Sequence, residues 1–284
     1  EAGNGSYLII TSLRDNARQR PDANSIREWS NTSAYFNGDA VRIELFAYPR
    51  TGLNLLRMSH VTGGLFENQA GPDTVCGTID NRTLSTYPAQ GRIYPIGCTG
   101  WLINTSGCAN RFLSAGHCFP TGVGQQVVEF NVPLSTSTGG LVHPPPEHQY
   151  AVDMGTVQRV QTVIGNDWSQ FFTAANSNTG LHARQMQGGA AYSIGSAPAV
   201  AGQTLRVTGY GTTDPNDPTT GGGLPLTQTQ VQKTHTGAYT LLSGTRMEYT
   251  VDTTGGNSGS PIVNGTSPSD VAIGIHTNAG CTTT

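Results

Sequence analysis

The chain carries little charge for its 284 residues. Lys, Arg, Asp and Glu make up 12% of it, about half the usual share in soluble globular proteins. The formal net charge of −3 gives no electrostatic reason to bind nucleic acid or an anionic membrane. No stretch reaches the roughly 18 apolar residues of a transmembrane helix. We therefore expect neither nucleic acid nor a membrane as a partner.

Long helical periodicity is nearly absent, and the first residues, EAGNGSYLII, have no basic start. We expect that a signal peptide has already been removed. None of the five cysteines forms a C-x-x-C pair, which argues against a zinc ribbon. Disulfides are the expected use of these cysteines, and they indicate an oxidising compartment. The sequence thus predicts a secreted, extracellular protein.

Short β-type runs recur along the chain. Each is rich in β-branched and aromatic residues and is bounded by Gly, Pro, Asn or Asp. The runs cover residues 6–13, 40–49, 53–61, 91–104, 125–134, 204–211, 246–253 and 271–277. Many strands joined by turn-rich connections predict an all-β sandwich or barrel. The stretch VTGGLFENQAGPDT (61–74) is rich in turn formers, so we divide the chain into residues 1–74 and 75–284.

Three residues together suggest covalent catalysis. Ser258 lies in GGNSGSP, His117 in FLSAGHC and Asp153 in QYAVDMGTV. A hydroxyl is a poor nucleophile unless a base lies within hydrogen-bond reach and an acceptor orients that base. His, Asp and Ser in this chain order are known for such a triad. The glycines around Ser258 suit an oxyanion hole, which needs bare backbone N–H groups aimed at one point.

These motifs resemble those of chymotrypsin-like serine peptidases, and most closely their bacterial glutamyl endopeptidase branch. The resemblance rests on five segments that agree in order and approximate spacing. They are DNRT (80–83), CTGWLI (98–103) with SAGHC (114–118), YAVDMGTV (150–157), YTVDTTGGNSGSP (249–261) and GIHTNAG (274–280). The matching region runs from about residue 75 to residue 281.

The resemblance implies two packed six-stranded antiparallel β-barrels, preceded here by a small β-rich segment, with the active site between the barrels. It implies Ser258 as nucleophile, His117 as general base and Asp153 as the residue that orients the imidazole. Gly256 and Ser258 would supply the oxyanion N–H donors. The family needs no cofactor or metal for this chemistry and acts on peptides or proteins, and we expect a monomer.

The family also suggests disulfides. The cysteine that opens CTGW pairs with the cysteine beside the catalytic histidine, which gives Cys98–Cys118 here. A second bridge, Cys76–Cys281, follows from a weaker analogy with lysyl endopeptidases. Cys108 would then be left over.

The residue preference has two candidate determinants. His276 matches a pocket histidine of glutamyl endopeptidases, and with hydroxyls from Thr253 and Thr277 it would bind a substrate carboxylate through charge-assisted hydrogen bonds. Asp252, six residues before Ser258, instead matches the pocket aspartate of trypsin and would select Lys or Arg. We favour cleavage after Glu or Asp and keep the trypsin-like or lysyl-like preference as the alternative.

Residues 1–74 match none of the peptidase motifs. They are either a propeptide of a zymogen or a permanent accessory module packed on the catalytic domain. A function of another class, a binding module on a peptidase scaffold that has lost catalysis, is the alternative to an enzyme. The presence of all three triad residue types disfavours it.

Overall fold

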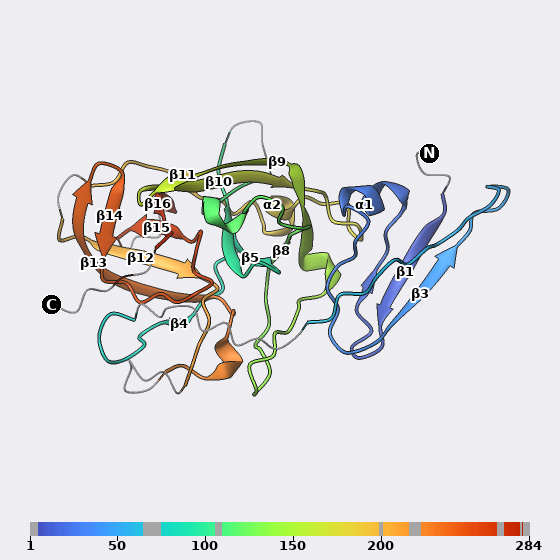
Figure 1. Ribbon diagram of the computed structural model, residues 1–284, viewed down its shortest axis with the longest axis horizontal. Coiled ribbons are helices and arrows are strands. Elements are labelled where there is room, and N and C mark those ends of the chain that lie inside the picture. Colours follow the sequence, from blue (N-terminus) through green and yellow to red (C-terminus); the bar gives the residue numbers. More distant parts are fainter. Residues whose placement is uncertain are drawn as a thin grey trace.

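The computed structural model (Figure 1) describes residues 5–64, 75–105, 110–198, 201–215, 223–265, 270–278 and 280. Nearly all its regular structure is strand, which confirms the all-β class. The described helices are short and are α1 (Ala23–Glu28), α2 (Ala183–Met186) and the 3-10 turns η1 (Gly116–Cys118), η2 (Pro146–His148) and η3 (Leu226–Gln228). Among the described residues, no helix has the length and apolarity needed to cross a membrane.

Six strands close a barrel in the order β10-β7-β6-β5-β8-β9, as expected for the first peptidase barrel. They are β5 (Gln90–Tyr94), β6 (Cys98–Leu102), β7 (Arg111–Ser114), β8 (Val127–Glu129), β9 (Gln149–Val163) and β10 (Asn166–Thr173). Strands β6 and β8 are buried along their whole length. Neighbouring layers must therefore cover both faces of these strands. The barrel interior is filled by aromatic and β-branched side chains such as Phe112, Val128 and Phe171.

The second unit is a sheet of seven strands, one more than the six expected for the second barrel. Its strands are β4 (Thr83–Leu84), β11 (Ser193–Ile194), β12 (Thr204–Gly209), β13 (Lys233–Ser243), β14 (Arg246–Tyr249), β15 (Pro261–Asn264) and β16 (Val271–Ile275). Two short strands enlarge it: β4 pairs with β13, and β11 pairs in parallel with β16. Buried Leu205, Val207 and Ile262 form its core.

A shared apolar cluster joins the barrel to the second sheet. Trp101 of β6 packs in it with Tyr192 and with Val263 and Ala272 of the sheet. The indole N–H of Trp101 donates to the carbonyl of Gly259, 2.9 Å away. This bond fixes the chain just after Ser258 against the barrel.

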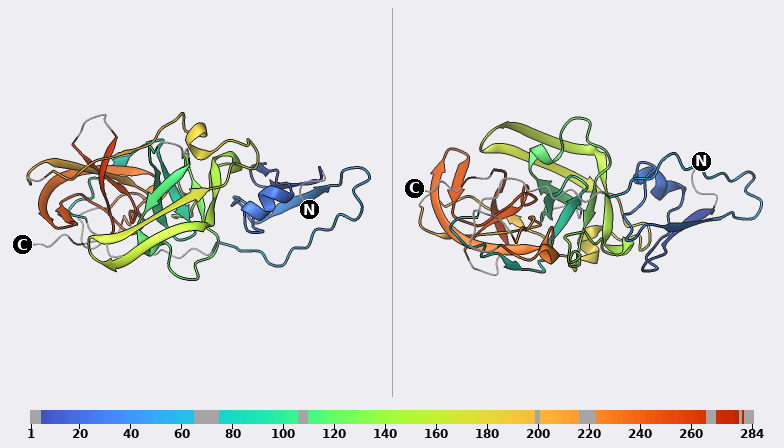
Figure 2. Two further views of the ribbon diagram at one scale, coloured as in Figure 1. Left: turned by 90° about the horizontal axis from the view of Figure 1, so that it is seen from above. Right: turned by 60° about the horizontal axis from the view of Figure 1, so that its bottom comes forward.

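Residues 5–46, which we call the N-terminal module, form a separate small sheet. Its strands β1 (Tyr7–Ser12), β2 (Arg18–Gln19) and β3 (Val41–Phe46) have the order β2-β1-β3. Figure 2 shows the module at one end of the molecule, with the barrel between it and the second sheet.

The module is packed on the barrel by its non-strand residues. Trp29, only 1% exposed, and Ala34 share a buried cluster with Val127 and Ala151 of the barrel. The side-chain amide of Gln149 accepts the N–H of Tyr35 and donates to its carbonyl, both at 2.8 Å.

The expected strand at residues 53–61 is wrong. This stretch pairs with no described strand, and Leu53 and Leu55 are 91% and 81% exposed. The segment contains as many apolar residues as a strand does. A strand, however, also needs a neighbouring strand to bond with and a covered face. The described residues offer neither to this segment.

Candidate active site

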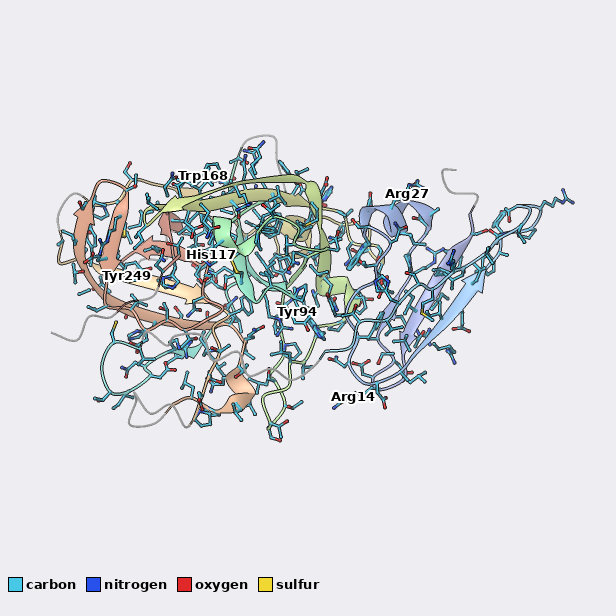
Figure 3. The ribbon with its side chains drawn as sticks, in the orientation of Figure 1. Arg14, Arg27, Tyr94, His117, Trp168 and Tyr249 are labelled. Carbon is cyan, nitrogen blue, oxygen red and sulfur yellow. A yellow bond between two sulfur atoms is a disulfide. The ribbon has the colours of Figure 1, made fainter. Side chains whose placement is uncertain are left out.

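His117 lies where the barrel meets the second sheet. Figure 3 labels this residue, and it labels Tyr249 among the strands of the second sheet. It belongs to η1, the single turn that follows β7. The expected disulfide Cys98–Cys118 is present and ties η1 to β6. The imidazole therefore projects from a turn that is fixed on both sides.

Asp167 holds His117 through two contacts. Its Oδ2 lies 2.6 Å from Nδ1 of the ring, and its Oδ1 accepts the backbone N–H of His117 at 2.9 Å. The carboxylate is 8% exposed, while the imidazole is 29% exposed. An ionised carboxylate only accepts hydrogen bonds, so Nδ1 carries the proton and Nε2 is left as the basic nitrogen.

Strand pairing explains this contact. β10 pairs antiparallel with β7, and Ser169 lies opposite Ser114. Continuing that register by two residues brings Asp167 opposite Gly116, next to His117. The sequence GNDWSQFFT (165–173), an aspartate just before alternating strand residues, marks Asp167 as a second candidate beside Asp153, but it does not decide between them.

The choice of Asp153 as the partner of His117 is corrected by this geometry. Asp153 is exposed, and its carboxylate accepts the N–H of Gly155 at 3.1 Å. It lies opposite Phe172 of β10, five residues along that strand from Asp167. At about 3.3 Å per residue, the strand position opposite Asp153 is roughly 17 Å from Asp167, which binds the imidazole.

Ser258 shares a pocket with His117. The nine lining residues are Ile96, Gly97, Cys98, His117, Thr212, Gln230, Gly255, Gly256 and Ser258. The carbonyl of Ser258 accepts the N–H of Thr99 at 2.8 Å, which anchors the serine to β6. The pocket thus contains a hydroxyl and a basic ring nitrogen on a fixed frame.

The turn before Ser258 presents unused backbone donors. The N–H of Asn257 donates to Thr254, but the N–H groups of Gly256 and Ser258 donate to none of the described residues. Gly256 has φ +101°, and a Cβ there would lie 2.5 Å from the carbonyl oxygen of Tyr210. A side chain at Gly256 would therefore disturb the turn. This arrangement suits the binding of an oxyanion.

His276 is buried beside the residues that follow Ser258. Its carbonyl accepts the N–H of Gly259 at 2.7 Å, and its N–H donates to Ser260 at 2.9 Å. Its Nδ1 lies 2.5 Å from the hydroxyl of Tyr249. Burial is the main cause that lowers the pKa of His276 to about 4, and electrostatic repulsion from His117, when that ring is protonated, adds to it. Burial raises the pKa of Tyr249, so this hydroxyl keeps its proton.

The other two predicted pocket residues flank this region. Thr253 is buried five residues before Ser258. Thr277, next to His276, is half-buried, and its hydroxyl donates to Asn278 at 2.9 Å. Their contact with substrate stays a prediction.

Asp252 is engaged within the protein. Its carboxylate, 0% exposed, accepts the N–H groups of Cys76 at 2.7 Å and Asn81 at 2.9 Å. Nδ1 of His235 lies 3.5 Å from this carboxylate but accepts the backbone N–H of Asp252 at 2.9 Å. That ring nitrogen bears no proton, so the contact is not an ion pair. A carboxylate used in this way is not a free anion for a Lys or Arg side chain.

Two of the cysteine predictions fall outside what the structure describes. Cys281 lies outside the described residues, so the Cys76–Cys281 bridge stays a prediction. Cys108 lies outside them as well. In the described part of the chain, the one group of side chains with metal-ligand spacing is Cys98, His117 and Cys118. Because its two sulfur atoms form a disulfide, they offer no thiolate to a metal.

Comparison with known proteins identifies the family. The family model described as Trypsin matches residues 77–284. The chain belongs to the trypsin family. It is a chymotrypsin-like serine endopeptidase, a hydrolase that acts on peptides or proteins.

Two solved structures are similar to this trypsin-family chain. A Glu endopeptidase in complex with MPD is 22% identical, with a TM-score of 0.50, over 72% of this chain and 86% of that one. A thermostable serine protease from an extremophilic microorganism is 17% identical, with a TM-score of 0.49, over 69% and 87%. No curated protein matches the chain.

Proposed function

We propose that the protein hydrolyses peptide bonds through a triad of Ser258, His117 and Asp167. The observation that carries this proposal is the bond between Asp167 and Nδ1 of His117, in a pocket that Ser258 also lines. Nε2 accepts the proton of the Ser258 hydroxyl as its oxygen attacks the substrate carbonyl. The imidazolium that forms is stabilised by the carboxylate of Asp167.

The backbone stabilises the charge that develops on the substrate. The unused N–H groups of Gly256 and Ser258 donate to the oxyanion of the tetrahedral intermediate. His117 then protonates the leaving amine, and the acyl-enzyme forms. Water, deprotonated by the same Nε2, attacks the acyl carbonyl, and the imidazolium returns this proton to Oγ of Ser258 as the ester bond breaks. No step in this scheme uses Asp153.

We assign the specificity to acidic side chains, Glu or Asp. The hydroxyl of Tyr249 donates a hydrogen bond to Nδ1 of His276. The single N–H of the neutral imidazole is therefore on Nε2, and this N–H is the donor to a substrate carboxylate. The engaged state of Asp252 disfavours the trypsin-like alternative. A secreted location agrees with the Cys98–Cys118 disulfide, since such bonds persist in oxidising compartments.

A labelling and cleavage experiment tests the function. The whole chain is treated with a fluorophosphonate, and a diverse peptide library is digested in parallel with the Ser258→Ala protein. We expect labelling at Ser258 and cuts after Glu or Asp that vanish in the variant. Cuts after Lys or Arg would keep the triad but refute the specificity. An unlabelled Ser258 without cleavage would favour a binding module that has lost catalysis.

A further inference from the structure

A buried ion pair lies outside the proposed triad, in the segment before β4. Arg82 and Asp80 are 2% and 4% exposed, and Nη2 of the arginine lies 2.6 Å from Oδ2 of the aspartate. Nε of Arg82 also donates to Oδ1 at 2.9 Å. Burying two charges costs free energy that their attraction offsets only with good geometry and further hydrogen bonds. The remaining bonds of Arg82 show what this pair holds in place.

Arg82 bridges the two chain segments that line the pocket. Its Nη1 donates to Oγ1 of Thr254 at 2.6 Å, and its Nη2 donates to the carbonyl of Thr212 at 2.9 Å. The hydroxyl of Thr254 in turn donates a hydrogen bond to the same carbonyl, at 2.9 Å. The N–H of Thr212 donates to the carbonyl of Gly255 at 2.8 Å. The guanidinium thus sits behind the turn that leads into Ser258.

The space for this contact depends on Gly211. A Cβ at this position would lie 2.4 Å from Oγ1 of Thr254 and 2.5 Å from Nη1 of Arg82. Both distances are too short for any real contact. Residue 211 must therefore lack a side chain for Arg82 to reach Thr254.

A second anchor fixes the segment that carries Arg82. The carboxylate of Asp252 accepts the N–H groups of Cys76 and Asn81. Asp252 and Thr254 lie six and four residues before Ser258 in the chain. Segment 76–82 is therefore bonded at two places to the nucleophile segment itself.

We infer that Arg82, acting through Thr254 and Thr212, is a positioning residue for the oxyanion donors. The inference rests on the proposed role of Ser258. Arg82 touches neither the substrate nor the reacting atoms. It fixes Gly255, and with it the direction of the N–H groups of Gly256 and Ser258. A displacement of such donors by about 1 Å costs on the order of 100-fold in rate.

Three substitutions test this role. Thr254→Val removes the hydroxyl at nearly constant shape, and Thr254→Ser retains it. Arg82→Lys keeps a charge beside Asp80 but cannot hold both Thr254 and Thr212. For each variant, kcat and KM are measured on one peptide, and active sites are counted by fluorophosphonate titration. We expect kcat per titrated site to fall about 10- to 100-fold in Thr254→Val and Arg82→Lys, with KM within about twofold. Thr254→Ser should restore most of the rate.

The matched control is Arg206→Lys. Arg206 of β12 is a partly buried arginine in the second sheet, paired with Asp270 at 3.8 Å, and it does not line the pocket. This variant should keep its kcat.

If Tm falls in Thr254→Val while kcat per titrated site is unchanged, the role is only structural and the inference is wrong. If wild-type Ser258 is not labelled, the proposed function itself fails. If Arg82→Lys does not fold, the Thr254 pair still decides.

Discussion

Asp167 binds His117 twice, through Nδ1 of the ring at 2.6 Å and through the backbone N–H at 2.9 Å. One carboxylate therefore fixes both the turn that carries the imidazole and the rotation of the ring. An aspartate placed this way also selects the tautomer in which Nε2 is basic. The first prediction follows from this double contact.

Asp167→Asn should reduce kcat by about 10⁴-fold, because an amide can donate to Nδ1 and so favours the wrong tautomer. The control is Asp153→Asn, which changes an exposed carboxylate on β9 and should leave kcat within about twofold. Steady-state kinetics on one peptide substrate, with Tm measured for both proteins, separate lost chemistry from lost folding. A large loss in Asp153→Asn alone would return the triad to the aspartate that the motif suggested.

The sequence located two of the three proposed catalytic residues. GGNSGSP and SAGHC are local motifs whose residues must lie together for the chemistry, so Ser258 and His117 could be read from the chain. The aspartate could not, because VDMG and GNDW both place an aspartate on the hairpin formed by β9 and β10. The choice depends on the register between β7 and β10, a long-range pairing that no local pattern contains.

The fold shows the same division between local and long-range information. The all-β class follows from composition and turn residues, and every expected run except 53–61 contains a strand, but the longest strands, β9 and β13, are not among the expected runs. Residues 53–61 have a strand's composition but no described partner strand. The addition of β4 and β11 to the second sheet depends on two-residue pairings, which are too short to leave a periodic pattern. Likewise, the position of Asp252 in the sequence suggests a specificity-pocket aspartate. Only the structure shows that its carboxylate binds the backbone N–H groups of Cys76 and Asn81.

The second prediction concerns pH. Folding lowers the pKa of His276 from 6.5 to about 4. Between these values the unfolded chain binds a proton that the folded chain does not, so stability falls as pH decreases through this window. The full shift corresponds to about 3 kcal/mol. Urea unfolding of the wild type at pH 7 and pH 4.5 should show this loss.

His276→Gln is the control for that measurement, because it removes the titrating group. Its free energy of unfolding should fall less than that of the wild type over the same pH interval. The difference between the proteins is the relevant quantity, since Glu129 titrates in both. Burial opposes ionisation of Glu129, but Arg92 and His143 outweigh it and lower its pKa. Equal pH slopes would show that His276 is not held neutral.

The third prediction separates the two candidate determinants of specificity. Asp252→Asn should keep the preference for acidic residues, because its carboxylate binds the N–H groups of Cys76 and Asn81. It should also lower the free energy of unfolding by about 1–3 kcal/mol, since one of these donors loses its acceptor. Cleavage-site mapping measures the first effect and urea unfolding the second. A wild-type preference for Lys or Arg that disappears in this variant would identify Asp252 as the specificity residue.

The fourth prediction asks whether the N-terminal module is a permanent part of the fold. Trp29→Ala removes a side chain that packs with Val127 and Ala151 of the barrel. It should destabilise the packed module by about 3–5 kcal/mol and increase cleavage within the module by an added protease. The matched control is Leu55→Ala, which changes an apolar residue that is 81% exposed and should change stability by less than about 0.5 kcal/mol.

Peptidase activity is measured in both variants. Activity that rises when the module is released would indicate a propeptide, whereas activity that falls with barrel stability would indicate an accessory module.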